Sequence, residues 1–224
     1  DSFKNYLLNK GLPKNKIFVV KNGYVKDFIK PPRKNYDLIK NIRLENKFII
    51  SYTGTHGMAH GLDFILKSIK NSPSNFHFIF QGDGAEKQNL ISLSRKLNLK
   101  NVTFLSSVSK KDITEYLNLA DVALVNLKKS DTFKSVIPSK IFENVALHKP
   151  ILLGVDGESK KLIEKYRVGI SFYPEDKDSF LNALNKIYEI NKDEFKENAD
   201  KMLVDFDRKV LASKMLDFVK KISI

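Results

Sequence analysis

The sequence of 224 residues contains no cysteine, and this absence excludes a range of chemistry. Without cysteine there can be no disulfide, no thiolate nucleophile and no zinc-thiolate site, a composition compatible with a cytoplasmic protein. The sequence also lacks a run of 18 apolar residues, so we expect no membrane-spanning helix. It contains no low-complexity tract and no internal repeat. With 42% hydrophobic residues, the chain is long enough to bury a substantial core.

Acidic residues are also in short supply, since 26 Asp and Glu stand against 39 Lys and Arg, a net charge of +13. Such an excess attracts phosphates, nucleic acid or an anionic membrane leaflet. The lysines occur in scattered pairs, not in a stripe interleaved with aromatic residues, and we therefore expect no nucleic-acid partner. A cytoplasmic protein with peripheral association at the inner face of the plasma membrane is compatible with this charge.

Short apolar runs alternate with helical patterns along most of the chain. This alternation is typical of βα units, so we expect an α/β fold with a doubly wound, Rossmann-like parallel sheet. The predicted strands are Ile17–Val20, Phe48–Tyr52, Phe76–Phe80, Val102–Leu105, Val122–Val125, Ile151–Leu153 and Gly169–Phe172. The predicted helices between them are Leu62–Lys70, Ala85–Leu97, Ile113–Leu119, Ser139–Leu147, Lys160–Tyr166 and Asp178–Ile190. Ligands bind such sheets beyond the carboxyl ends of the strands.

Composition suggests where the domain boundaries lie. The polar, proline-marked segment Pro31–Asn35 predicts a linker, so residues 1–35 would be the tail of a preceding domain and a linker. Residues 36–206 would form the sheet domain. Residues 207–224 would form a terminal helix, part of a carboxy-terminal helical segment with an apolar stripe. Because the chain begins without methionine, we expect it to be part of a longer protein.

The segment Pro138-Ser139-Lys140-Ile141-Phe142-Glu143 carries the strongest functional signal. Proline is tolerated at the first helical position, so Pro138 predicts a helix start that leaves the next backbone N–H groups free for a phosphate. Lys140 adds positive charge. Glu143 lies on the same helix face, where its carboxylate can accept hydrogen bonds from a ribose. The alternative is an amphipathic helix with a solvated Lys140–Glu143 pair.

A glycine-rich loop follows the predicted strand at Phe48–Tyr52. Gly54, Gly57 and Gly61 would let a ligand approach the backbone, although their spacing matches neither the dinucleotide fingerprint nor a P-loop. An ordinary strand-to-helix turn is the alternative.

His56 and His60 are four residues apart in this loop. Neighbouring glycines argue against a helical zinc pair, so we expect no metal there. Contact with a phosphate or a sugar hydroxyl is one interpretation, and a loop histidine without a ligand is the other.

Other motifs favour structural roles. Gly82–Gly84 suits a tight turn, and the Asp-x-Asp segments Asp176–Asp178 and Asp205–Asp207 are interpreted as helix starts in preference to metal sites. The loop Ser106–Ser109 offers backbone groups that could pair with a nucleobase.

Together, these segments resemble the donor-binding half of a GT-B retaining glycosyltransferase of family 4, a group that builds bacterial surface polysaccharides. The similar segments, in family order, are Val19–Val25, Tyr52–Leu62, Gly82–Gly84, Leu119–Val122, Pro138–Glu143 and Lys149–Ile151. The loop Thr55–Gly61 resembles a subgroup that makes aminosugar linkages, such as fucosamine transferases of O-antigen or capsule assembly.

The resemblance implies metal-independent transfer, with retention, from a nucleotide diphosphate sugar, expected to be a UDP-sugar, to a glycan or lipid-linked acceptor. No cofactor is expected. Lys140 and Glu143 would be the catalytic residues. The residues implied to bind the donor are Glu143 for the ribose, the Val108 backbone for the base, and Lys140 with the Ser139, Gly54 and Thr55 amides for the diphosphate, with His56 or His60 as further phosphate contacts.

The sequence departs from the family pattern at two places. Ser135 stands where the first glutamate of the Glu-x7-Glu motif would be, and Thr55 and His60 replace the arginine and lysine of the first loop. The acceptor-binding amino-terminal domain would lie outside this chain, so we expect nucleotide binding with little transfer by these residues alone. A GT-B sugar-nucleotide epimerase or phosphorylase and a non-catalytic flavodoxin-like interaction module are the alternative functions.

Overall fold

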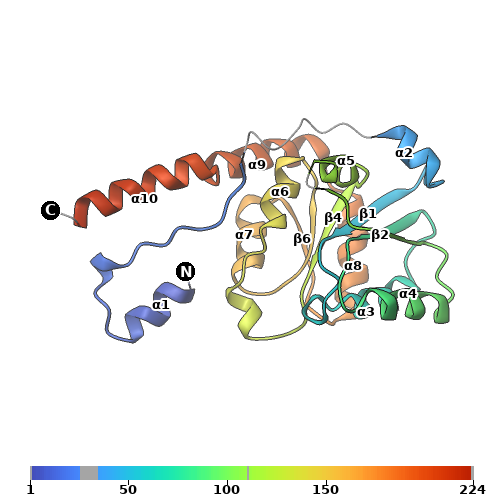
Figure 1. The fold of residues 1–224 in the computed structure, drawn as a ribbon, viewed down its shortest axis with the longest axis horizontal. Coiled ribbons are helices and arrows are strands. Elements are labelled where there is room, and N and C mark those ends of the chain that lie inside the picture. Colours follow the sequence, from blue (N-terminus) through green and yellow to red (C-terminus); the bar gives the residue numbers. More distant parts are fainter. Residues whose placement is uncertain (1, 26–34, 110, 223–224) are drawn as a thin grey trace.

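The computed structural model describes residues 2–25, 35–109 and 111–222. Its centre is a six-stranded sheet of order β3-β2-β1-β4-β5-β6, in which every neighbouring pair of strands is parallel (Figure 1). The strands are β1 Phe48–Thr53, β2 Phe76–Gln81, β3 Val102–Leu105, β4 Val122–Asn126, β5 Ile151–Gly154 and β6 Gly169–Ser171. The sequence therefore placed these six strands correctly.

Helices cover both faces of this sheet, which confirms the expected doubly wound α/β fold. One face packs against α3 (Leu62–Ile69), α4 (Lys87–Lys96) and α8 (Lys177–Tyr188). The other packs against α2 (Tyr36–Asn41), α5 (Ile113–Leu117), α6 (Lys140–Ala146), α7 (Glu158–Tyr166) and α9 (Lys192–Asp205). The outlying helices are α1 (Ser2–Asn9) and α10 (Arg208–Ile222).

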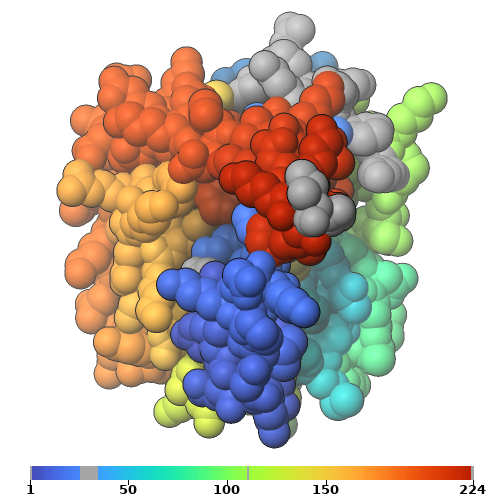
Figure 2. Space-filling view, turned by 90° about the vertical axis from the view of Figure 1, so that its left-hand side faces the viewer, coloured from blue at the N-terminus to red at the C-terminus, as the bar shows by residue number. Residues whose placement is uncertain are grey.

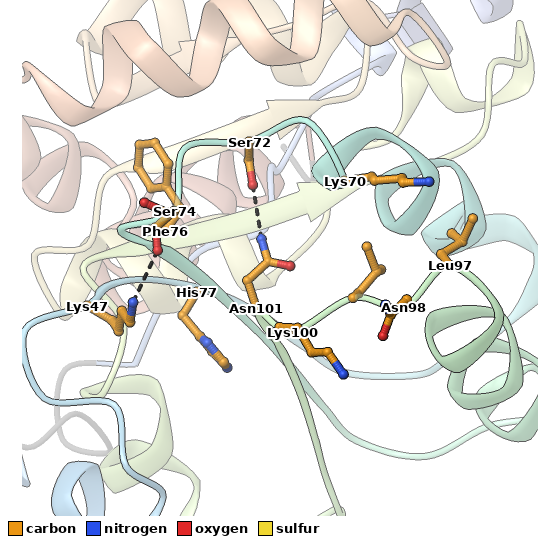
Figure 3. Close-up of a pocket in the computed structure, with 11 residues that line it drawn as sticks. Lys47, Lys70, Ser72, Ser74, Phe76, His77, Leu97, Asn98, Lys100 and Asn101 are labelled. Atoms are coloured by element: carbon orange, nitrogen blue, oxygen red, sulfur yellow. Dashed lines mark hydrogen bonds between the residues drawn. The ribbon is translucent and has the colours of Figure 1, made fainter.

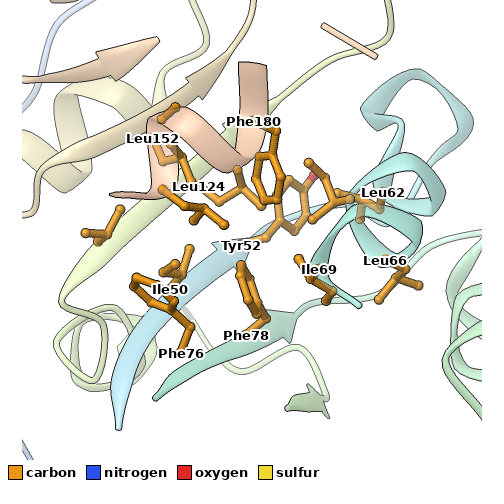
Figure 4. Packing of buried hydrophobic residues seen from close by; sticks show 14 of the residues in the cluster. Ile50, Tyr52, Leu62, Leu66, Ile69, Phe76, Phe78, Leu124, Leu152 and Phe180 are labelled. Atoms are coloured by element: carbon orange, nitrogen blue, oxygen red, sulfur yellow. The ribbon is translucent and has the colours of Figure 1, made fainter. Parts of the chain in front are cut away.

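Side chains that alternate along the strands build the core. Ile50 of β1 and Phe78 of β2 are register partners and lie in the same cluster, which α8 closes with Phe180 (Figure 4). All three side chains are almost completely buried. At roughly 1.5–3 kcal/mol for each large apolar side chain removed from water, this layer is a major source of the stability of the sheet.

β1 occupies the point where the strand order reverses. It pairs with β2 on one side and with β4 on the other. From β1 the chain continues through β2 and β3 to one edge of the sheet, and from β4 it continues through β5 and β6 to the other edge. Open α/β sheets bind their ligands at the carboxyl ends of the strands at such a point. The loops after β1 and β4 are therefore the place to look for a site.

The predicted strand at Ile17–Val20 is wrong. This segment is extended but joins no strand of the described chain. Instead it lies beside α10, where Phe18 stacks on Phe218 with 4.8 Å between the ring centroids. Phe18 thus packs against a helix and not against the sheet.

The N-terminal segment and α10 lie on the same side of the molecule, away from the sheet (Figure 1). In Figure 2 the N-terminal segment (blue) and α10 (red) form one face of the molecule. α10 has no buried residue, and Met215 of its predicted apolar stripe is 47% exposed. Most of the predicted linker Pro31–Asn35 lies outside the described residues. No helix of the described chain is long and apolar enough to cross a membrane.

Candidate functional site

The loops after β1 and β2 are joined by backbone hydrogen bonds. The Gly54 N–H donates to the Gln81 carbonyl at 2.9 Å, and the His56 N–H donates to the Asp83 carbonyl at 2.8 Å. The His56 carbonyl in turn accepts from the Glu86 N–H at 2.9 Å. These bonds fix the glycine-rich loop against the turn that leads into α4.

Gly82 is where the two loops approach most closely. Its φ is +137°, and a Cβ at this position would lie 2.0 Å from the Gly54 carbonyl oxygen. A real Cβ cannot approach so closely, so only glycine fits. The geometry supports the structural interpretation of the Gly82–Gly84 turn.

Lys140 reaches from α6 to the loop after β1. Its Nζ lies 4.2 Å from the centroid of the Tyr52 ring, which favours a cation–π contact. A Cβ on Gly54 would lie 2.9 Å from the same Nζ, so the glycine leaves room for the ammonium group. Lys140 forms no ion pair with any acid in the described part of the chain. Burial lowers its pKa to about 8, although the charge of Glu143 acts in the opposite direction.

Tyr52 forms the floor beneath this ammonium group. The side chain is completely buried, and its hydroxyl donates to the Thr55 carbonyl at 2.7 Å. Burial raises the pKa of Tyr52, so the phenol stays protonated. The ring is therefore held rigidly where it meets Lys140, a role that the sequence did not single out.

Two imidazoles border the same loop. His56 is completely buried, and neither ring nitrogen has a hydrogen-bond partner. Burial, followed by the charge of Lys87, lowers its pKa to about 4, so the ring is neutral near pH 7. His60 is half-buried with an unpartnered Nδ1, and burial followed by the charge of Lys140 lowers its pKa.

Three further polar residues lie at the same ends of the strands. Gln81 is the last residue of β2, Asn126 is the last residue of β4, and Lys87 is the first residue of α4. The Asn126 Nδ2 donates to the His60 carbonyl at 2.8 Å, and this bond joins the loop after β1 to the end of β4. The Lys87 Nζ donates to the Gly82 carbonyl at 2.8 Å. Gln81 is buried with both amide atoms unpartnered. Sequence reasoning missed all three, although a polar residue at the end of a buried strand was a usable signal for Gln81 and Asn126.

The start of α6 differs from the prediction. The helix begins at Lys140 with Ser139 as its N-cap residue, so Pro138 is not the first helical residue. The Pro138 carbonyl accepts from the Ile141 N–H, and this tight turn places the proline one residue before the cap. The Ser139 and Lys140 N–H groups donate to no acceptor among the described residues. Glu143 is exposed on the same helix.

Gly54 differs from the prediction in its role, since its amide donates to Gln81 and is not free for a phosphate. The Thr55 amide has no partner in the described chain. Val108 lies in the loop after β3, which β2 separates from β1. The structure thus brings Gly54, His60 and Lys140 together around Tyr52, with Val108 further along the same edge.

The two Asp-x-Asp segments have different positions. Asp176 is the N-cap of α8 and accepts from the Ser179 N–H, as expected of a helix start. Asp205 is the last residue of α9 and accepts from the Tyr166 hydroxyl. Asp207 directly precedes α10, and its Oδ1 accepts from the Lys209 N–H, so this segment also marks a helix start. Within the described ranges, no group of three or more His, Cys, Asp or Glu side chains could hold a metal ion.

Comparison with known proteins identifies a matching family. The model of the family "Glycosyl transferases group 1" matches residues 34–202. TuaH of Bacillus subtilis (strain 168), which carries the provisional name of a teichuronic acid biosynthesis glycosyltransferase, is 28% identical over 142 residues, covering 62% of this chain and 34% of its own length.

Solved structures share the fold at low sequence identity. The Anabaena protein Alr3699/HepE in complex with UDP and glucose has a TM-score of 0.77 and 17% identity, over 97% of this chain and 60% of its own. A glycosyltransferase from Rickettsia africae ESF-5 has a TM-score of 0.81 and 17% identity, over 98% of this chain and 61% of its own. The chain therefore spans only part of the length of these relatives.

Proposed function

The chain belongs to the family Glycosyl transferases group 1, and from this membership we propose that it binds the donor of a glycosyl transfer, a UDP-sugar, at the carboxyl ends of β1 and β4. The HepE structures contain UDP or UDP-glucose, which supports this choice of donor. We extend the proposal to retention at the anomeric carbon and to transfer without a metal ion.

The observation that carries the proposal is the unpaired ammonium group of Lys140. Lys140 is partly buried, and a charge removed from water is costly unless it is paired. The groups around its ammonium are a phenol ring and two imidazoles with lowered pKa. A diphosphate would supply the missing negative charge. The site is thus arranged for an anion that arrives from solution.

The proposed roles follow from position. The Lys140 ammonium, together with the Ser139 and Thr55 amides, would hold the diphosphate and stabilise the charge that develops when it departs. Glu143, one turn along α6, would accept hydrogen bonds from the ribose. The Val108 backbone would meet the base, and His56 or His60 would donate to a phosphate oxygen.

The name of a relative supports the proposed class of acceptor. The name of TuaH refers to teichuronic acid, a polysaccharide, and supports a glycan or lipid-linked acceptor in surface polysaccharide synthesis. An aminosugar donor, with capsule or O-antigen as the product, is the finer proposal from the Thr55–Gly61 segment. We also propose a cytoplasmic site of action, at the inner face of the plasma membrane, on the basis of the excess positive charge. Little transfer by these 224 residues alone stays a prediction.

A flavodoxin-like interaction module is the competing function from a different class. It would need an acidic cluster at the strand ends, where this chain has Lys140, Lys87 and two histidines. A sugar-nucleotide epimerase would share the donor site, so only assay of the product separates it from a transferase.

Substitution of Glu143 tests the proposed ribose contact. Loss of a charged acceptor costs about 1.5–3 kcal/mol, so Glu143→Ala should weaken UDP binding roughly ten- to hundredfold. Calorimetry measures the affinity, and Glu197→Ala, which removes an exposed glutamate of α9, is the control. If Glu143→Ala and Glu197→Ala bind UDP as the unchanged protein does, the ribose contact is wrong.

A further inference from the structure

A second cavity lies at the opposite edge of the sheet from Lys140. It has a volume of about 500 Å³ and lies at the amino ends of β2 and β3, beside Phe76, His77 and Asn101 (Figure 3). This volume is within the range of small-ligand pockets. The proposed donor site does not extend to this edge, since its residues follow the carboxyl ends of the strands.

The charge of this cavity is of one sign. Lys47, Lys70 and Lys100 line it from three different segments of the chain, and no aspartate or glutamate lines it. None of the three lysines forms an ion pair within the described residues. Three ammonium groups at one cavity create a positive potential there, which attracts an anion.

Hydrogen bonds give the cavity a defined wall. The Asn101 Nδ2 donates to the Ser72 Oγ at 3.0 Å, which joins the two loops that enter β2 and β3 (Figure 3). The Lys47 Nζ donates to the Ser74 carbonyl at 3.1 Å. His77, only 7% exposed, is held by its Nε2 contact of 2.8 Å with the Thr103 hydroxyl. These bonds hold the loops that form the cavity, whereas the three lysine side chains are exposed.

Helix ends alone do not account for these lysines. Lys70 is the C-cap residue of α3, where a positive charge favours the exposed helix carbonyls. Lys47 and Lys100, however, lie outside the helices, one residue before β1 and two residues before β3. Their convergence on one cavity is not explained by helix capping.

We propose that this cavity binds a phosphate-bearing anion, independently of the donor site. Inorganic pyrophosphate and the headgroup of an anionic phospholipid share the chemistry that three lysines would recognise. The double variant Lys47→Gln/Lys100→Gln removes two of the charges. The control Lys186→Gln/Lys201→Gln removes the same charge from exposed positions on α8 and α9 that do not line the cavity.

The experiment uses two probes with the whole chain. Pyrophosphate is titrated while backbone amide signals are followed by NMR, so that shifts at Ser74 and Asn101 report this cavity and shifts at Thr55 report the donor site. Sedimentation with phosphatidylcholine vesicles, with and without phosphatidylglycerol, measures binding to an anionic lipid headgroup. A lysine near an anionic surface contributes about fivefold in affinity, so the cavity variant should lose roughly 25-fold and the control little.

Either probe can support the proposal. Pyrophosphate shifts at Ser74 and Asn101 that vanish in the cavity variant indicate a soluble ligand, and selective loss of vesicle binding indicates a lipid headgroup. Equal losses in the cavity and control variants would show only an effect of net charge and overturn the proposal. Absence of both pyrophosphate shifts at the cavity and vesicle binding would overturn it as well, whatever happens at Thr55.

Discussion

At the scale of single residues, Lys140 illustrates what a sequence reveals and what it hides. The type of residue and its place after a strand already indicated an anion site. The sequence did not show that the ammonium group would lie on the Tyr52 ring, or that Gly54 would make room for it. Those contacts depend on how two segments almost ninety residues apart pack together, which no local pattern encodes.

Two buried histidines give the protein a predicted sensitivity to acid. Burial lowers the pKa values of His56 and His77 to about 4 from the usual 6.5, so both rings are neutral in the folded protein near pH 7. Between pH 6.5 and 4 the unfolded chain binds more protons than the folded one. The free energy of unfolding should therefore fall as the pH falls through this window, by at most about 1.4 kcal/mol per pH unit for each histidine.

The variant His77→Gln isolates one of these contributions, because glutamine keeps a polar contact available to Thr103. Urea unfolding at several pH values from 7 to 4.5 measures the free energy. We expect the variant to lose less stability on acidification than the unchanged protein. Parallel curves for the two proteins would show that His77 does not titrate with a lowered pKa.

At the scale of elements, the apolar runs of the sequence predicted the six strands because the four inner strands are buried on both faces of a parallel sheet and the edge strands β3 and β6 are half-buried. The same pattern at Ile17–Val20 misled the prediction, since a strand also needs a neighbour with free backbone groups. The predicted helix Ser139–Leu147 began one residue before α6, and Pro138, taken as the helix start, lies two residues before it. Proline marks the end of the preceding loop equally well, and a tight turn intervenes.

Gly82→Ala tests whether contact between the loops after β1 and β2 stabilises the site. Gly82 and Gly11 both have positive φ, so alanine strains the backbone at either position. A Cβ at Gly82 would also overlap Gly54, whereas nothing lies within 4 Å of a Cβ at Gly11. Gly82→Ala should therefore cost about 1–3 kcal/mol more than Gly11→Ala. Equal losses in thermal unfolding would contradict the close packing of these loops.

At the scale of the whole molecule, the net charge of +13 predicted anionic partners but not their places. The fold concentrates unpaired positive charge at both edges of the sheet, around Lys140 and around Lys47 and Lys100. The resemblance to the family predicted the anion site at Lys140 through its motifs. The cavity beside Lys47 and Lys100 has no sequence motif, because its lysines come from separate segments that only the folded sheet brings together.

Calorimetric titration of the variant Lys140→Met with UDP tests the central claim most directly. Removal of a charged donor should weaken UDP binding roughly ten- to hundredfold. The melting temperature should not fall, because the variant removes a partly buried charge that has no ion-pair partner among the described residues. Lys165→Met is the matched control, since Lys165 also lies over a tyrosine ring but on α7. UDP affinity that is the same in the unchanged protein and Lys140→Met would contradict the account.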